Sequence, residues 1–394
     1  MRLGLKRRLR PLVYKILGDK AAGAVGAKAQ KQIRQLRTQK ELLRATVLYL
    51  PRHQHDSMVP PHPEWEERWH QDRSRVLFLV TQDYGGSAYQ WVQAINRHTE
   101  WAARLAVVVP HPFGYPNDLV LGAAEAIGAD FRALMDQADV IQIKDESGFL
   151  SGINQFEPDF LTSIDKPLVT TLYGSQARRR QNTDSFRDHV NGFEGVVSLT
   201  PDLCFEWIDR PYYVPAAVDY ADIPLTWTDT RSIAHSPSSR ELKGTALLEQ
   251  AVAELDLTVD IITGATHAQT LDRVAHAGLF FDQAGADTIS GEVIGWYGNA
   301  ALEAASRGIP TIAHLSPRAL DGAERGGYPA RDRMAILNTE RDAGALRTLI
   351  DDHLAKAPEE RQELSTATRK WVEKYHGAQV IGRRLTALYE QIRR

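Results

Sequence analysis

The chain has 394 residues, of which 43% are hydrophobic and 25% charged, and its formal net charge is −3. This length suits two domains that each bury a core, and no apolar run reaches the roughly 20 residues that span a bilayer. Because Cys204 is the single cysteine, an internal disulfide and a cysteine-cluster metal site are excluded, and we expect a cytoplasmic protein.

Positive charge is concentrated in residues 1–44, which contain thirteen Lys and Arg residues but only two acidic residues, Asp19 and Glu41. Leucines are interleaved with the basic residues. A basic amphipathic segment suits the surface of an anionic membrane. It would also suit nucleic acid, and a helix packed on its own protein is a third interpretation. We favour peripheral contact with the inner face of the membrane. The sequence predicts a basic helical extension and a Pro- and His-rich connector over 1–74, with regular structure starting only at Arg75.

From Arg75 onward, short apolar runs alternate with helical segments. The first series predicts strands over 76–80, 105–109, 140–143, 168–172 and 195–199, and helices around 91–98 and 134–138. The pattern pauses at 212–219, and a second series predicts strands at 232–235, 259–263, 278–282 and 309–314 and helices at 246–255, 268–275 and around Glu303. Such alternation implies right-handed parallel units. The predicted fold class is therefore α/β, with two Rossmann-like doubly wound parallel-sheet domains facing a central cleft.

Gly85 and Gly86 follow the first predicted strand, where glycines allow a ligand to approach the backbone closely. The pair does not form a G-x-G-x-x-G fingerprint, so the sequence does not indicate nicotinamide binding. A tight turn between strand and helix explains the pair equally well.

A second candidate segment, 236–245, follows the first strand of the second series. Arg240 and Lys243, beside the hydroxyls of Ser238 and Ser239 and a helix start, could hold a diphosphate. The alternative is an ordinary surface pair of cations.

The most informative segment is 296–313, which predicts a glycine-started helix, a break and a buried strand. Glu303 then lies near the start of a helix, at the edge of the sheet where ligands bind. A helix N-terminus attracts phosphate, and a carboxylate one turn inside can accept hydrogen bonds from ribose hydroxyls. The segment therefore suits a nucleotide diphosphate that carries a sugar. The residues that we assign to binding this donor, besides those named above, are Glu292, Tyr297, Gly298 and Asn299.

Segment 296–313 resembles the donor-site motif of retaining GT-B glycosyltransferases of the family-4-like group. Segment 236–245 resembles the element of that family that contains an Arg and a Lys-Gly pair. Segment 213–219 resembles the link between its two domains, and segment 371–389 resembles the C-terminal helix that crosses back to the first domain. The resemblance covers roughly 75–394. It implies an N-terminal acceptor domain over 75–222, a donor domain over 223–368 and a C-terminal helix over 369–394 that crosses back.

Two departures from the family pattern concern the donor sugar. The family commonly has a glutamate eight residues before the position of Glu303, and this chain has Gly295 there. The family also has a His-Gly pair in its first domain, where this chain has Tyr173-Gly174. The missing contacts could be supplied by Glu292, Asp282 or His235.

The resemblance implies transfer of a sugar from a nucleotide diphosphate sugar to a hydroxyl acceptor, with retention of anomeric configuration and without a metal ion or other cofactor. Glu303 would hold the ribose, and Arg240 and Lys243 the leaving diphosphate. We expect the acceptor to be a glycan or lipid-linked glycan of the cell envelope. Two alternatives remain: a glycosyltransferase that modifies a DNA base, and a non-catalytic protein that binds nucleotide sugars or serves assembly.

Overall fold

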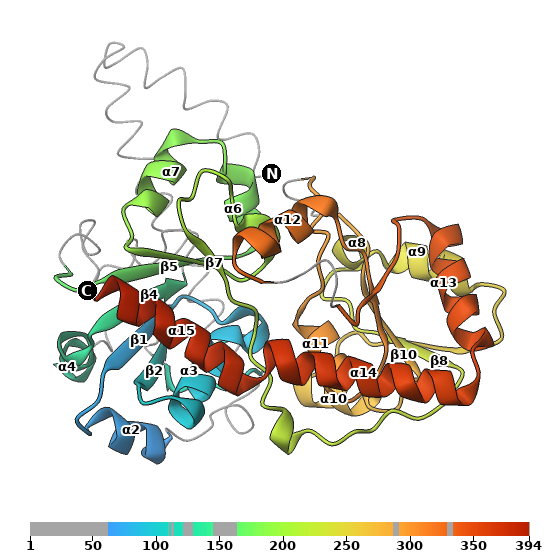
Figure 1. Ribbon diagram of the computed structural model, residues 1–394, viewed down its shortest axis with the longest axis horizontal. Coiled ribbons are helices and arrows are strands. Elements are labelled where there is room, and N and C mark those ends of the chain that lie inside the picture. Colours follow the sequence, from blue (N-terminus) through green and yellow to red (C-terminus); the bar gives the residue numbers. More distant parts are fainter. Residues whose placement is uncertain are drawn as a thin grey trace, which may run out of the picture.

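The computed structural model describes residues 62–108, 110–111, 114–120, 129–144, 164–286, 291–328 and 334–393. Two parallel sheets, one from each half of the chain, form two α/β domains that lie side by side (Figure 1). The predicted fold class is confirmed. The basic segment 1–44 lies outside the described residues. Among the described helices, none is both long and apolar enough to cross a membrane.

The first domain is built on a seven-stranded sheet of order β3-β2-β1-β4-β5-β6-β7. Its central strands are buried along their whole length, as expected for a parallel sheet covered on both faces. The strands are β1 (Arg75–Val80), β2 (Ala102–Val107), β3 (Leu119–Val120), β4 (Val140–Lys144), β5 (Leu168–Leu172), β6 (Gly195–Ser198) and β7 (Pro211–Tyr213). The helices are α2 (Pro63–Trp69), η1 (Tyr84–Gly86), α3 (Ser87–His98), α4 (Ala129–Gln137), α6 (Gly174–Arg180), α7 (Asp184–Asn191) and η3 (Pro201–Leu203).

The second domain has a five-stranded sheet of order β12-β11-β10-β8-β9. Its strands are β8 (Ser232–His235), β9 (Thr258–Ile261), β10 (Leu279–Gln283), β11 (Thr311–Ala313) and β12 (Leu337–Asn338). The helices are η4 (Tyr220–Asp222), α8 (Arg240–Lys243), α9 (Thr245–Val252), α10 (His267–Val274), α11 (Asn299–Ser306), α12 (Pro317–Arg325) and α13 (Ala343–Ala355).

Helix α2 corrects the prediction that regular structure starts only at Arg75. Pro63 occupies the first helical turn, where its missing N–H costs nothing. Trp65 and Trp69, four residues apart, share one buried face. The indole of Trp69 also donates a hydrogen bond of 2.8 Å to Gln137 on α4. The prolines of this stretch predict a loop, whereas tertiary packing stabilises a short helix there.

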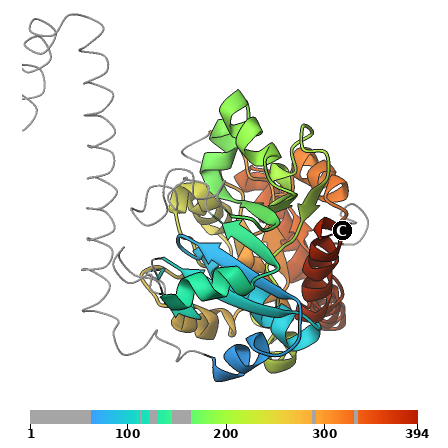
Figure 2. The same ribbon diagram turned by 90° about the vertical axis from the view of Figure 1, so that its left-hand side faces the viewer.

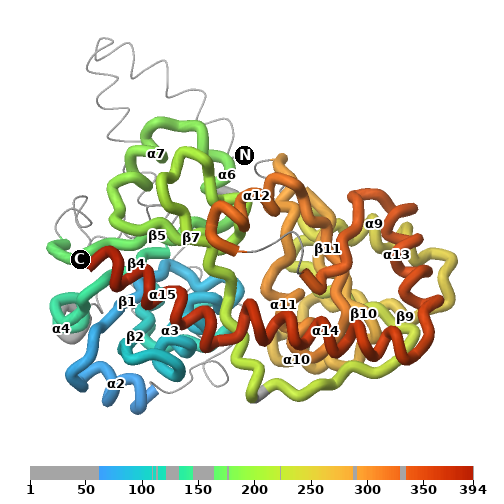
Figure 3. Tube along the Cα trace, in the orientation of Figure 1, coloured from blue at the N-terminus to red at the C-terminus, as the bar shows by residue number. Residues whose placement is uncertain are grey.

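The chain crosses between the domains twice, once after β7 and once between α14 (Pro358–His376) and α15 (Ala378–Ile392), as Figure 3 traces. The two crossings pair with each other: Val218 N–H donates to the His376 carbonyl, and Ala378 N–H donates to the Val218 carbonyl. The predicted returning helix is thus two helices that meet at Gly377. In Figure 2, where the first domain faces the viewer, α15 runs along the side of that domain, and it packs on α3.

The domains also touch through α12 of the second domain, which packs on η3 and β7 of the first. Two glycines of α12 make this approach possible. A Cβ on Gly322 would lie 2.0 Å from the Pro201 carbonyl oxygen, and one on Gly326 would lie 2.5 Å from the Cβ of Tyr213. The buried core of the second domain continues across this contact to include Tyr213 and Cys204. The domains therefore share a packed interface on this side.

Candidate functional site

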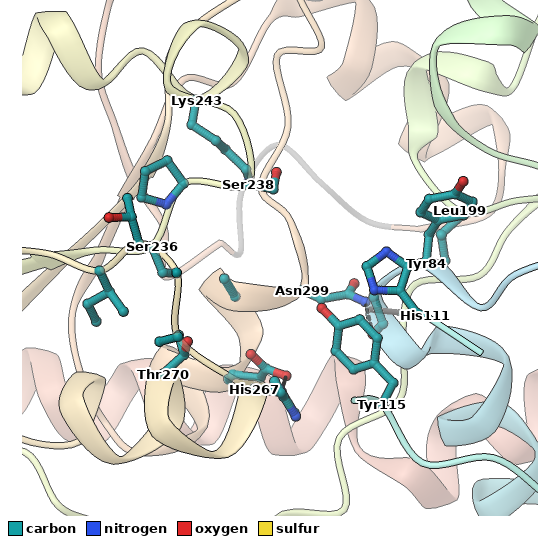
Figure 4. Close-up of a pocket in the computed structure, with 18 residues that line it drawn as sticks. Tyr84, His111, Tyr115, Leu199, Ser236, Ser238, Lys243, His267, Thr270 and Asn299 are labelled. Atoms are coloured by element: carbon teal, nitrogen blue, oxygen red, sulfur yellow. Dashed lines mark hydrogen bonds and ion pairs between the residues drawn. The ribbon is translucent and has the colours of Figure 1, made fainter. Parts of the chain in front are cut away.

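A pocket of about 360 Å³ lies between the two domains at the carboxyl ends of their strands. In doubly wound sheets, ligands bind at this edge. Figure 4 shows the side chains that line the pocket. The lining comprises Tyr84, Gly85, His111, Tyr115, Leu199, Ser236, Pro237, Ser238, Lys243, Ile262, Thr263, Gly264, Ala265, His267, Thr270, Asn299, Ala300 and Glu303.

Glu303 lies in this lining, in the second turn of α11. Its Oε1 is 2.7 Å from Nε2 of His267, the first residue of α10, and both side chains are largely buried. This contact uses one carboxylate oxygen. The ring of Tyr115, from the first domain, lies 5.0 Å from the ring of His267. The Glu303 carboxylate is therefore placed at the domain boundary, beside the pocket.

Lys243 contributes a positive charge to the same pocket. Its Nζ lies 2.8 Å from Asp282 Oδ1, and the other oxygen of Asp282 accepts a hydrogen bond of 2.5 Å from Gly298 N–H. The carboxylate of Asp282 is almost fully buried, whereas Lys243 retains 13% exposure. Asp282 thus ties the end of α8 to the residue that caps α11. This arrangement holds the ammonium group near the N-terminal end of α11.

A glycine contact joins the domains at the pocket itself. Gly85 has a φ of +71°, and its carbonyl accepts a hydrogen bond of 2.9 Å from the side-chain amide of Asn299 on α11. A Cβ on Gly85 would lie 2.6 Å from that amide nitrogen. Only glycine combines this backbone conformation with so close an approach.

The structure therefore brings together five of the predicted residues in one lining: Gly85, Ser238, Lys243, Asn299 and Glu303. Three others support this region. Gly86 precedes α3, Ser239 caps α8 with its side chain, and Gly298 caps α11. Tyr297 lies in the core, 3% exposed and stacked on Trp296, with its hydroxyl 3.1 Å from His376 Nε2.

The structure places the two remaining candidates outside the pocket lining. Arg240 is half-exposed and pairs with Glu249 at 2.5 Å on the surface of the second domain. Glu292 accepts hydrogen bonds from Gln181 of the first domain and Arg318 of the second, at 2.8 and 3.2 Å. In this arrangement Glu292 links the domains.

The departure at Gly295 has a steric reason. This residue has a φ of +61°, and a Cβ there would lie 2.2 Å from Ser316 Oγ. A glutamate cannot occupy the position on this backbone. The suggested substitutes Asp282 and His235 are both buried, 2% and 0% exposed. Burial lowers the pKa of His235 to about 4, and its ring nitrogens lie within hydrogen-bonding distance of the Phe281 carbonyl and the Thr245 hydroxyl.

Tyr173, the other departure, precedes α6, and its ring lies 5.2 Å from Nζ of Lys144. Lys144 is buried and pairs at 2.8 Å with Asp83, whose carboxylate also accepts the backbone N–H groups of Ala88 and Tyr89 at the start of α3. This ion pair fixes the loop that carries Gly85 and was not predicted. Asp83 follows β1 and Lys144 ends β4. Knowledge that β1 and β4 are neighbours in the sheet would therefore have indicated this ion pair.

Sequence reasoning also missed His267 and the aromatic residues Tyr84, His111 and Tyr115. They lie in loops or at a helix start, and no spacing links them in the sequence. Within the described part of the chain, no group of three or more His, Cys, Asp or Glu side chains could hold a metal ion.

The His267–Glu303 pair gives a pH-dependent contribution to stability. Burial lowers the pKa of His267, but the hydrogen bond and the charge of Glu303 raise it above its ordinary value of 6.5. The stabilisation is therefore complete below the unfolded pKa and is lost as pH rises through the folded pKa. We expect His267→Gln to lower the free energy of unfolding more at about pH 6 than at about pH 9, as urea titrations would measure. Equal losses at both pH values would show that the pair does not carry this charge.

No family model matches the chain, and no curated protein matches its sequence. Its structure, however, is similar to those of several glycosyltransferases. Sucrose-phosphate synthase from Thermosynechococcus elongatus is 14% identical, with a TM-score of 0.56 over 81% of this chain and 99% of the other. An alpha-glucosyltransferase in complex with UDP and a 13-mer DNA containing a HMU base is 9% identical, with a TM-score of 0.59 over 82% and 100%. Anabaena HepE in complex with UDP-glucose is 12% identical, with a TM-score of 0.53 over 81% and 98%. The chain therefore has the two-domain fold of these GT-B glycosyltransferases.

Proposed function

We propose that the chain transfers a sugar from a nucleotide diphosphate sugar to a hydroxyl group of an acceptor, with retention of anomeric configuration. The observation that carries this proposal is the pocket between the domains, where the Lys243 ammonium, the Glu303 carboxylate and the start of α11 converge. These are the groups that a diphosphate and a ribose require. The similar structures support a nucleotide donor, since two of those named above hold UDP or UDP-glucose.

The proposed mechanism relies on positioning and on charge compensation. Lys243 and the N-terminal end of α11 stabilise the negative charge that develops on the diphosphate as it leaves. Glu303 accepts hydrogen bonds from the ribose through the oxygen that His267 does not use. The Gly85 loop holds the first domain against α11, so that donor and acceptor meet in one pocket. We propose that no metal ion is needed for these roles.

A thermal-shift screen tests the donor class. The five common nucleoside diphosphates and their sugar derivatives are added to the full chain. A ligand at 100 times its Kd adds about 2.7 kcal/mol to the stability of the folded state. We expect one base to stabilise the protein clearly more than the others, and the matching nucleotide sugars to be turned over. Absence of stabilisation by every diphosphate would contradict the proposal.

For the acceptor we propose a glycan or lipid-linked glycan of the cell envelope, reached by a protein held at the inner face of the membrane through residues 1–44. Thirteen basic residues against two acidic ones motivate this part of the proposal. Deletion of 1–44 should abolish sedimentation with anionic liposomes and leave nucleotide binding unchanged. Uncharged liposomes provide the control. If the full-length and truncated proteins sediment equally, the membrane proposal fails.

A second candidate function is transfer of the sugar to a base of DNA. The basic segment 1–44 motivates it, and one of the similar structures contains DNA. Tight duplex binding with a steep salt dependence would favour it. The departures at Gly295 and Tyr173 motivate a third function, a non-catalytic nucleotide-sugar-binding protein. Tight binding of a nucleotide sugar without turnover to any acceptor or to water would favour that function.

A further inference from the structure

The first-domain side of the pocket carries three rings, those of Tyr84, His111 and Tyr115, which we call the aromatic wall. The ring of Tyr84 meets that of His111 edge to face, with centroids 5.2 Å apart, and lies 6.0 Å from that of Tyr173. His111 and Tyr115 are 5.2 Å apart. Tyr84 remains 49% exposed although it is a large ring. Figure 4 shows Tyr84, His111 and Tyr115 opposite the polar residues of the second domain.

Charge divides the pocket in the same way. In the described lining, Lys243 is the single Lys or Arg, and Glu303 the single acidic residue, and both belong to the second domain. The first domain contributes Tyr84, Gly85, His111, Tyr115 and Leu199. Burial lowers the pKa of His111 to about 4, so its ring is neutral at pH 7.

Lys144, beneath the wall, does not change this balance. Its side chain is 1% exposed, and its ammonium group is held by the Asp83 carboxylate, the Ser87 hydroxyl at 2.6 Å and the Tyr84 carbonyl at 3.2 Å. Lys144 is thus both paired and buried, whereas Lys243, which is also paired with a carboxylate, keeps 13% exposure. In the described lining, the Lys and acidic side chains thus belong to the second domain, and the first-domain side chains are aromatic or apolar.

From this division, and resting on the proposed function, we propose that the aromatic wall binds an uncharged sugar ring of the acceptor, with Tyr84 as the ring on which it packs. A pyranose has an apolar face of C–H groups, which packs on an aromatic ring, and a rim of hydroxyls, which need hydrogen-bonding partners at the edge. An exposed ring in a pocket whose lining is mainly apolar fits this use.

The wall fits a phosphate-bearing acceptor group less well. Grooves that bind single-stranded nucleic acid combine stacking rings with cations that follow the backbone. The first-domain residues of the described lining supply rings without cations. Among the described lining residues, no first-domain cation would compensate a phosphate that lay against the wall, and an uncompensated charge is costly in a partly buried pocket.

Saturation-transfer NMR tests this inference on the full chain saturated with the nucleoside diphosphate that the thermal-shift screen selects. The probes are the neutral methyl glycosides of glucose, galactose, mannose and N-acetylglucosamine, with glucose 1-phosphate and a thymidine oligonucleotide for comparison. We expect at least one methyl glycoside to bind, with the strongest transfer to the C–H protons of one face. Tyr84→Ala should weaken that binding by roughly 3- to 10-fold, and Tyr84→Phe and Tyr84→Trp should retain it.

Leu225→Ala is the matched control, since Leu225 is an exposed apolar side chain, 64% exposed, outside the pocket lining. Unchanged glycoside affinity in Tyr84→Ala, or binding of only the phosphorylated probes, would overturn the inference. In that case intact nucleotide binding would leave the proposed function standing. If the wild-type chain binds no nucleotide, the proposed function itself fails, independently of Tyr84.

Discussion

Replacement of Lys243 by alanine is expected to weaken binding of a nucleoside diphosphate by roughly 10- to 150-fold. A hydrogen bond to a charged group contributes about 1.5–3 kcal/mol, and Lys243 is the single Lys or Arg side chain in the described lining of the pocket. Titration calorimetry with the diphosphate found in the thermal-shift screen measures the effect. Unchanged affinity would place the diphosphate elsewhere.

Arg240→Ala is the matched control for this experiment. Arg240 lies three residues earlier in the chain, but it is half-exposed and pairs with Glu249. We expect its replacement to change affinity by less than about threefold, because an exposed ion pair contributes little. A large loss in Arg240→Ala instead would show that this side chain leaves Glu249 to reach the ligand, as the sequence analysis proposed.

Loss of Lys243 also affects folding, and the experiment must separate the two effects. Asp282 is almost fully buried, and of its partners in the described part of the chain the Gly298 N–H would remain. Removing one partner of a buried pair is costly. We therefore expect Lys243→Ala to lower the melting temperature, and the double variant with Asp282→Asn to recover part of the loss. Nucleotide affinity should stay low in the double variant, because the positive charge is still absent.

Glu303→Gln is expected to weaken nucleotide binding by roughly 10-fold or more and to reduce sugar transfer at least as much. Glutamine keeps one acceptor oxygen but loses the charge that strengthens the hydrogen bonds from His267 and from the ribose. Affinity is measured by calorimetry and transfer by release of the nucleoside diphosphate. The effect should be smaller for a deoxyribose analogue of the same nucleotide, because that ligand lacks one of the hydroxyls.

Two controls accompany the Glu303 variant. Glu249→Gln changes a half-exposed carboxylate outside the pocket lining, and we expect it to leave affinity unchanged. If Glu303 serves only the fold, Glu303→Gln will lower the melting temperature while the folded fraction binds nucleotide normally. That pattern would exclude the ribose contact.

The fold could be predicted from the sequence because its central strands are largely apolar runs of three to six residues between helical segments. Strands such as β1 and β10 are buried on both faces, so composition alone marks them. The edge strands β3 and β12 have two residues each and carry no such signal. Helix α2 was missed because its proline and histidine neighbours are typical of loops.

Membership of the pocket lining was predictable where one segment supplies both the backbone and the side chain. Gly85 follows β1, Asn299 begins α11, and Lys243 and Glu303 lie within two turns of a helix start. Parallel strands bring these positions to one edge. The direction in which a surface side chain points was not predictable, as Arg240 shows. The partnership of His267 with Glu303 was also not predictable, since these residues come from different helices and meet only in three dimensions.

The contact of α12 with η3 and β7 has a consequence for exchange of domains between proteins of this fold. Gly322 and Gly326 in one domain are matched to the backbone at Pro201 and Tyr213 in the other, and Val218 is paired with Ala378 and His376 where the chain crosses. A chimera that exchanges only the second domain would place foreign side chains against these backbones. A chimera of this protein therefore has to take η3, β7 and α12 from the same parent chain.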